Sequence, residues 1–149
     1  MWDYPRPPRL AADTREVVVR TEGVTVAISQ RAVRVLETAG PPTFYLPPDD
    51  VRRDLLIARP GTSACEWKGL ASYWSVRAGQ RVLRDVAWSY PDPLPGFERI
   101  RDYLSFFPGR IECTVEGERV RPQPGGFYGG WITSEIVGPV KGEPGTAGW

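Results

Sequence analysis

Short apolar runs rich in β-branched residues, separated by glycine and proline, recur along most of the chain. Residues 16–29 hold two valine-rich runs joined at Glu22-Gly23, where glycine can take the positive φ that a tight hairpin needs. Residues 68–76 and 80–90 form a second such pair across Ala78-Gly79. The pattern therefore predicts two β-hairpins.

The apolar spacing predicts further short strands. Residues 32–36 fit either a short helix or a strand, and we favour a strand. Residues 103–107 and 111–115 indicate two more, and alternation in the second directs Cys113 toward the core.

Two proline pairs flank Tyr45 and bias it to extended geometry, because proline disfavours helical backbone in the residue before it. A short helix is predicted next, capped by Asp49 or Asp50. Its residues Val51 and Leu55 are spaced to share one inward stripe.

These patterns divide the chain into an extended arm (1–14), a mainly β domain (15–120) with at most two or three short helical turns, and a C-terminal strap (121–149). Twelve of the 29 strap residues are Gly or Pro. The strap also carries four large aromatic residues, Phe127, Tyr128, Trp131 and Trp149. We expect it to pack on the domain or on a second subunit, which favours a homodimer.

Length and charge restrict the class of protein. A chain of 149 residues with 41% hydrophobic side chains suits one ordinary core. The net charge of +1 is scattered, so no basic block supports nucleic acid as a partner. Neither a signal-like start nor a run of about 18 apolar residues is present, so we expect a cytoplasmic protein with no membrane partner.

The chain has no histidine, which removes every mechanism that depends on imidazole and the commonest zinc sites. Its two cysteines, Cys65 and Cys113, are too few for a thiolate metal site and suit a reducing compartment. We therefore expect no metal and no cofactor.

Four ordered motifs resemble the domain of unknown function family 427. They are Ser29-Gln-Arg-Ala with Val35-Leu-Glu, Tyr45-Leu-Pro-Pro-Asp-Asp-Val, Thr62-Ser-Ala-Cys-Glu-Trp-Lys-Gly-Leu-Ala-Ser-Tyr, and Ala87-Trp-Ser-Tyr-Pro. The resemblance covers about residues 15–117. The strap resembles that of actinobacterial members, and an excess of arginine, seventeen against two lysines, agrees with a high-GC source.

The resemblance implies a compact, strongly bent antiparallel sheet of the Mss4-like or β-tent kind, without the zinc of many similar folds. Members often have Pro or Tyr where this chain has Glu66 and Trp67. The family sometimes carries a nucleotidyltransferase label. The chain has neither a phosphate-cradling glycine loop before a helix nor a paired-aspartate metal motif on a strand.

Cys65 and Lys68 are the candidate catalytic residues. Cys65 is the candidate nucleophile, and an ammonium three residues away can lower a thiol pKa if both side chains face one cavity. The alternative for Cys65 is a structural thiol. Lys68 is either an anion-binding or Schiff-base amine, or the partner of Glu37 or Glu66 in a surface salt bridge.

The candidate ligand-binding residues are aromatic or charged. Arg31 and Glu37 are six residues apart, so on one strand they would share a face, either as one wall of a site or as a solvated pair. Aromatic rings suit a flat or apolar ligand, although each alone also suits a core. The four rings are Tyr45, Tyr73, Trp88 and Tyr90.

We therefore expect a pocket shared by the cysteine, the lysine and the aromatics, with Arg31 or Glu37 at its rim. Because Lys68 and Tyr73 are an odd number of residues apart, the chain before Gly69 must bend, or one of the two must leave the site. Two functions fit: a cofactor-free enzyme or covalent binder acting on a small polar or carbonyl-bearing molecule, or a non-catalytic ligand-binding or protein-interaction module.

Overall fold

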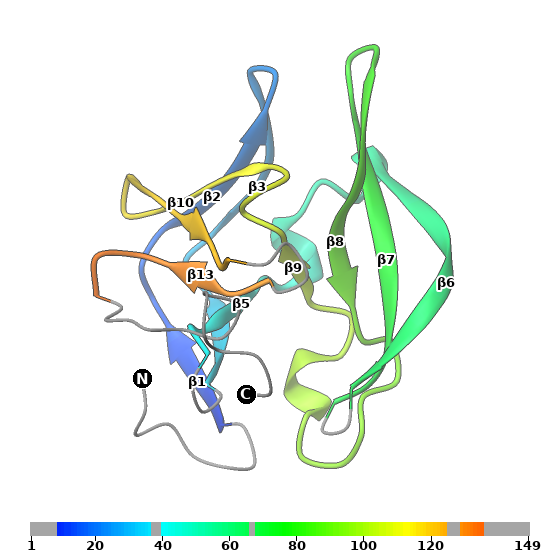
Figure 1. Ribbon diagram of the computed structural model, residues 1–149, viewed down its shortest axis with the longest axis vertical. Coiled ribbons are helices and arrows are strands. Elements are labelled where there is room, and N and C mark those ends of the chain that lie inside the picture. The colour runs from blue at the N-terminus through cyan, green and yellow to red at the C-terminus, as the bar shows by residue number, and fades with distance from the viewer. Residues whose placement is uncertain (1–8, 37–39, 66–67, 125–128, 136–149) are drawn as a thin grey trace.

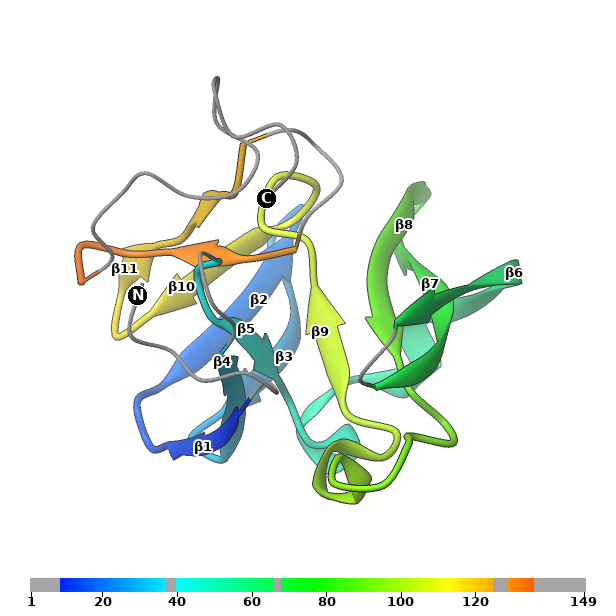
Figure 2. The ribbon, with the colours of Figure 1, turned by 60° about the horizontal axis from the view of Figure 1, so that its bottom comes forward.

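The computed structural model describes residues 9–36, 40–65, 68–124 and 129–135. In these residues the strands form four sheets, and every strand pairs with its neighbours antiparallel. Strands β6–β8 stand on one side of the molecule and β1–β5 with β10–β13 on the other, with β9 between them (Figures 1 and 2). The predicted mainly β, antiparallel fold is confirmed.

The first predicted hairpin is confirmed as β2 (Val17–Thr21) and β3 (Val24–Ser29). Its turn residues Glu22 and Gly23 have φ of 51° and 74°. Two successive positive φ values match the right-handed twist of the strands, which is why glycine suits this turn. β10 (Glu112–Val115) and β11 (Glu118–Arg119) extend the sheet in the order β11-β10-β2-β3.

A three-stranded sheet has the order β1-β4-β5. Its central strand, β4 (Ala32–Leu36), confirms the choice of strand over helix. β5 (Thr43–Tyr45) lies between the proline pairs, as predicted. β1 (Arg9–Asp13) pairs with β4 along its whole length, so the second half of the predicted arm belongs to a sheet.

The second predicted hairpin is also confirmed, as β7 (Gly69–Ala78) and β8 (Arg81–Ser89). β9 (Leu104–Phe106) joins β8 on one side, and β6 (Leu56–Cys65) joins β7 on the other. The sequence analysis assigned no strand to residues 56–65.

The reason lies in Pro60-Gly61, a pair that ordinarily interrupts a strand. Here the β6–β7 register shifts between Ala58 and Thr62, and Gly61 adopts a φ of +92°. The strand therefore continues past the pair through a bulge.

The helical content of the described residues is three short 3-10 turns: η1 (Pro48–Asp50), η2 (Arg53–Leu55) and η3 (Glu98–Ile100). The single helix predicted after Asp49 or Asp50 is wrong. Val51 has extended backbone, with φ −115° and ψ 137°, and bridges to Ala27 on β3, which separates η1 from η2. None of the helical elements in the described part of the chain has the length and apolarity to cross a bilayer.

Buried side chains group into two hydrophobic clusters within the described residues. The larger contains Val17, Val19, Phe44 and Phe106, together with Cys113, which is the core residue that the alternation of β10 predicts. The smaller cluster contains mainly aromatic and β-branched residues: Val33, Val35, Tyr45, Ala71, Trp88, Tyr90, Phe97, Ile100 and Phe107. The candidate site is built on this smaller cluster.

The described part of the strap packs on the domain. β12 (Arg121–Pro122) pairs with β13 (Trp131–Ile132), and the fully buried Trp131 ring stacks on Phe44 with centroids 4.8 Å apart. The indole N–H of Trp131 donates to the Phe106 carbonyl over 2.9 Å. Phe127, Tyr128 and Trp149, on which the strap prediction also relied, lie outside the described residues.

Candidate functional site

A cavity of about 430 Å³ adjoins the smaller cluster. Its volume falls within the range of about 300–1,000 Å³ that is usual for small-molecule sites. One wall comes from β6–β8, a second from β4, β5 and the residues Gly40 and Pro41, and a third from the strap. The lining residues are Val35, Gly40, Pro41, Thr43, Tyr45, Ser63, Ala64, Cys65, Lys68, Ala71, Tyr73, Trp88, Tyr90, Phe107, Gln123, Gly129 and Gly130.

Three buried aromatic residues form the back of the cavity. Tyr45, Trp88 and Tyr90 are 1%, 7% and 5% exposed. The Trp88 indole N–H donates to the Tyr45 hydroxyl over 3.1 Å, and the two rings meet edge to face at 6.0 Å. The Phe107 ring also packs on Trp88, with 4.5 Å between centroids and the planes tilted by 49°. The indole is therefore held in place by two neighbouring rings, and aromatic walls of this kind suit a flat ligand.

Strand register explains why Tyr73 joins this wall. Tyr73 on β7 pairs directly with Trp88 on β8, and residues directly opposite in an antiparallel ladder point to the same face. The Tyr73 hydroxyl lies 2.6 Å from the Ser63 hydroxyl on β6, and either can donate. Two hydroxyls thus meet at the β6 side of the cavity.

Lys68 reaches the cavity because it lies in a turn before β7. Gly69 has a φ of +112°, a backbone conformation that L side chains rarely adopt, and the chain bends there. The Lys68 carbonyl accepts a hydrogen bond of 2.9 Å from the Leu94 amide, which holds the turn against the 91–96 loop. Because the chain bends here, Lys68 and Tyr73 both line the cavity although they are an odd number of residues apart.

The burial of Lys68 is the most unusual property of the site. Lys68 lines the cavity, yet the residue is only 5% exposed. Lysine is seldom so buried unless its ammonium group has polar contacts, because removing a charge from water is costly. An amine held at this depth is suited to contact an anionic or carbonyl oxygen.

The two cysteines have different environments. Cys65 ends β6, pairs with Gly69, is half-buried and lines the cavity. Cys113 lies in the larger cluster, and burial raises the pKa of its thiol well above the usual range. Only a thiolate is a strong nucleophile, so Cys113 is the inert member of the pair.

Arg31 lies away from the cavity, contrary to its expected place on the rim. Its guanidinium forms an ion pair of 2.8 Å with Asp50, whose carboxylate also accepts from the Ser29 hydroxyl. Arg31 precedes β4, so the face-sharing argument for a strand does not apply to it. It is absent from the described residues around the cavity. Arg31 therefore gives no support to the predicted Arg31–Glu37 wall. Glu37 lies outside the described residues.

Sequence reasoning missed the contribution of the strap. Gln123, Gly129 and Gly130 line the cavity, and Gln123 is only 6% exposed. The signal available in the sequence was Trp131, whose need for a buried site brings the adjacent glycines onto the domain. Glycine itself carries no side chain that would mark it as a site residue.

Two further properties bear on the choice of site. A more open hollow of about 480 Å³ follows β3 and is lined by residues 23–28, Asp50 and Arg52. It contains neither the thiol nor the amine, so the chemistry favours the first cavity. Among the residues that the structure describes, no three His, Cys, Asp or Glu side chains are grouped to hold a metal ion.

Comparison with known families finds a match over most of the chain. The family model described as a domain of unknown function, DUF427, matches residues 9–117. This range begins at β1 and ends before β11, so it contains every lining residue except those of the strap. None of the curated proteins matches the chain.

Proposed function

The chain belongs to the DUF427 family, and we propose that it binds a small, flat molecule bearing a carboxylate or carbonyl group in the cavity between β6–β8, the β4–β5 side and the strap. The observation that carries the proposal is the burial of Lys68 in the lining of a cavity that also contains several aromatic rings. The rings supply apolar area and the amine supplies one oriented donor.

Charge and shape together restrict the ligand. The Tyr45, Trp88 and Phe107 rings are fixed by mutual contacts, so they offer flat surfaces without a further ordering cost. Ammonium donates and does not accept, which selects an oxygen acceptor for the contact with Lys68. Small aromatic carboxylates are accordingly the simplest probes.

The test measures binding of 4-methylbenzoate by calorimetry to the wild type and two variants. K68M keeps a side chain of similar length and removes the amine, whereas K141M removes the other lysine of the chain. We expect K68M to weaken binding by roughly 10- to 100-fold, as for a charge-assisted hydrogen bond. K141M should bind as the wild type does. Equal affinity in all three proteins would contradict the proposal.

A second candidate function, covalent chemistry on a carbonyl compound, is favoured by the position of Cys65 on the same wall. The Lys68 amine can condense with an aldehyde to an imine and water. Alternatively, the Cys65 thiol can add across the carbonyl, with sulfur on carbon and the proton on oxygen. Both steps need only the protein and the substrate.

This candidate is tested with 4-methylbenzaldehyde and sodium borohydride, which reduces an imine to a stable secondary amine. Peptide mapping by mass spectrometry should find the adduct on Lys68 in preference to Lys141. Equal labelling of Lys68 and Lys141, or no labelling of either, would instead favour a purely non-covalent binding protein.

A homodimer and a cytoplasmic location also remain proposals. The dimer rests on the aromatic content of the strap, part of which lies outside the described residues. The location rests on the two isolated cysteines, which suit a reducing compartment.

A further inference from the structure

The strap completes the cavity from outside the part of the chain that the family model matches. That match ends at residue 117, whereas Gln123, Gly129 and Gly130 lie beyond it and still line the cavity. The family-matched domain therefore supplies two walls, and the strap supplies the third.

Trp131 fixes the position of this third wall. Its ring is fully buried on Phe44, its indole N–H donates to Phe106, and its backbone amide donates to the Pro42 carbonyl over 2.8 Å. Gly129 and Gly130 immediately precede it, so they cannot move far from the cavity while Trp131 stays in place.

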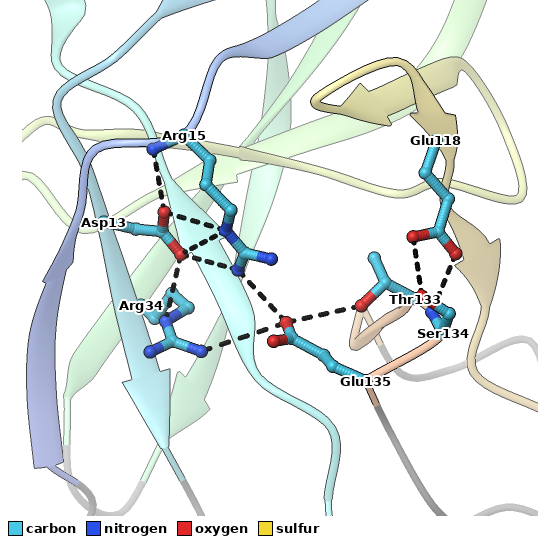
Figure 3. Close-up of polar contacts among 7 residues, drawn as sticks. All are labelled: Asp13, Arg15, Arg34, Glu118, Thr133, Ser134 and Glu135. Carbon is cyan, nitrogen blue, oxygen red and sulfur yellow. Dashed lines mark hydrogen bonds and ion pairs between the residues drawn. The ribbon is translucent and has the colours of Figure 1, made fainter.

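A polar clasp holds the strap just after Trp131 (Figure 3). The Ser134 amide and hydroxyl both donate to the Glu118 carboxylate, over 2.7 and 3.0 Å. Glu135 accepts from Arg15 over 3.0 Å, and Arg15 in turn binds Asp13 at the end of β1. The segment is thus tied to two different sheets.

The two glycines allow the strap backbone to touch the site directly. A methyl group added at Gly129 would overlap the six-membered ring of Trp88. One added at Gly130 would overlap the Gln123 side-chain oxygen and the ring of Pro41. The Gln123 carboxamide is therefore held against the strap backbone at the cavity surface, in a position set by close packing.

We propose that Gln123 is a specificity-determining residue of this cavity and selects ligands that carry a neutral hydrogen-bonding group in addition to the carboxylate or carbonyl at Lys68. This proposal rests on the proposed small-molecule binding. A carboxamide has two donor and two acceptor positions, so it can keep a protein contact and bind a ligand amide or hydroxyl together.

The expected selectivity follows from burial. A ligand amide or hydroxyl that hydrogen-bonds to the carboxamide gains a contact that a methyl group cannot make, whereas an apolar wall is nearly indifferent to the change. An ammonium group at Lys68 would offer only donors, so it could not hydrogen-bond to the donor of a neutral ligand group as the carboxamide can. The ligand class is therefore a flat ring with an anionic or carbonyl end and a neutral amide or hydroxyl elsewhere.

The experiment compares 4-carbamoylbenzoate with 4-methylbenzoate, which share the carboxylate and differ in the neutral group. Calorimetry is done on the wild type, Q123L and Q80L. Gln80 is exposed in the turn between β7 and β8 and is the matched control. We expect the wild type and Q80L to prefer the carbamoyl probe by roughly 3- to 10-fold, and Q123L to lose that preference.

Two results separate this inference from the proposed function. If the wild type binds neither probe, both proposals are overturned. If it binds both with equal affinity, or if Q123L keeps the preference, the role of Gln123 alone is overturned. Should Q123L fail to fold, Q123M provides the same comparison, because methionine keeps a side chain of similar length without the carboxamide, and an unchanged preference in Q123M overturns the inference.

Discussion

Individual residues of this protein differ in reactivity mainly because of where the strands place them. Cys65 and Cys113 are both free thiols, but one ends a strand at the cavity and the other is fully buried between strands. The spacing of Cys113 in an alternating apolar run identified it as core. The motif around Cys65 marked it only as a candidate site residue.

We predict that iodoacetamide alkylates Cys65 and leaves Cys113 unmodified in the folded protein. Burial raises the pKa of the Cys113 thiol, so its thiolate is scarce as well as inaccessible. Peptide mapping by mass spectrometry after timed exposure gives both rates in one sample. The variant C113S should keep the wild-type rate at Cys65, and comparable rates at the two cysteines would contradict the structure.

Asp13 gives a pH-dependent contribution to stability. Burial by itself raises the pKa of Asp13, but hydrogen bonds and charge from Arg15, with charge from Arg34, outweigh it and lower the pKa below its usual 3.8. A lowered folded-state pKa means that the stabilisation is present above pH 4 and is lost as the pH falls through the folded pKa.

The variant D13N should therefore lose roughly 1–3 kcal/mol of unfolding free energy at pH 7, because the half-buried Arg15 guanidinium loses a charged acceptor. The difference from the wild type should shrink as the pH falls below 4. Urea unfolding at several pH values measures this. A deficit that stays constant down to pH 2 would show that the effect does not come from the Asp13 charge.

At the scale of elements, the strap contacts the β7–β8 hairpin where Gly129 packs on Trp88. We predict that G129A lowers the melting temperature and weakens binding of 4-methylbenzoate, because its methyl group must displace either the indole or the strap backbone. The matched control is G117A, in a β10–β11 turn where an added methyl meets nothing within 4 Å.

Gly117 has a φ of +80°, so G117A also carries backbone strain, but it lies away from the cavity. We expect G117A to reduce stability without changing affinity in the protein that remains folded. A G129A variant with wild-type affinity would show that the strap backbone is not a working wall of the site.

Periodicity and turn chemistry predicted the two hairpins and β4 because their signals are local. A glycine at a positive φ or an alternating apolar run acts within a few residues. β6 was missed because Pro60-Gly61 indicates an interruption, and only the pairing with β7 shows that the strand continues through a bulge. The helix predicted near Asp50 was wrong because the bridge from Val51 to Ala27 overrides local helical spacing.

The cavity was predictable only in part, for a related reason. Tyr73 and Trp88 share a face because they are paired in the β7–β8 register. Lys68 and Tyr73 are an odd number of residues apart, so both could line the cavity only if the chain bends between them, as it does at Gly69. Arg31 was expected at the rim of the cavity on the assumption that it lies on the same strand as Glu37, but β4 begins only at Ala32. Gln123 reaches the cavity through long-range packing of Trp131, which has no local signature.

At the scale of the whole molecule, the strap contacts both sides of the fold, through Trp131 on Phe44 of β5 and through Gly129 against Trp88 of β8. We predict that a chain truncated after residue 120 melts at a lower temperature, because the Trp131 ring leaves the surface of Phe44. If the strap also contributes to a homodimer, the truncated chain sediments as a smaller species. A truncated protein unchanged in both properties would show the strap to be dispensable.

The most direct test of the central claim follows tryptophan indole signals in ¹H–¹⁵N spectra during titration with 4-methylbenzoate, with W88F assigning the Trp88 signal. The indole N–H of Trp88 is bound to Tyr45 at the back of the cavity, whereas that of Trp131 is bound to Phe106 in the larger cluster. We predict that the Trp88 signal shifts with saturation and that the Trp131 signal moves much less. Two results would contradict ligand binding in this cavity. In the first, no indole signal shifts during the titration. In the second, the Trp131 signal shifts and the Trp88 signal does not.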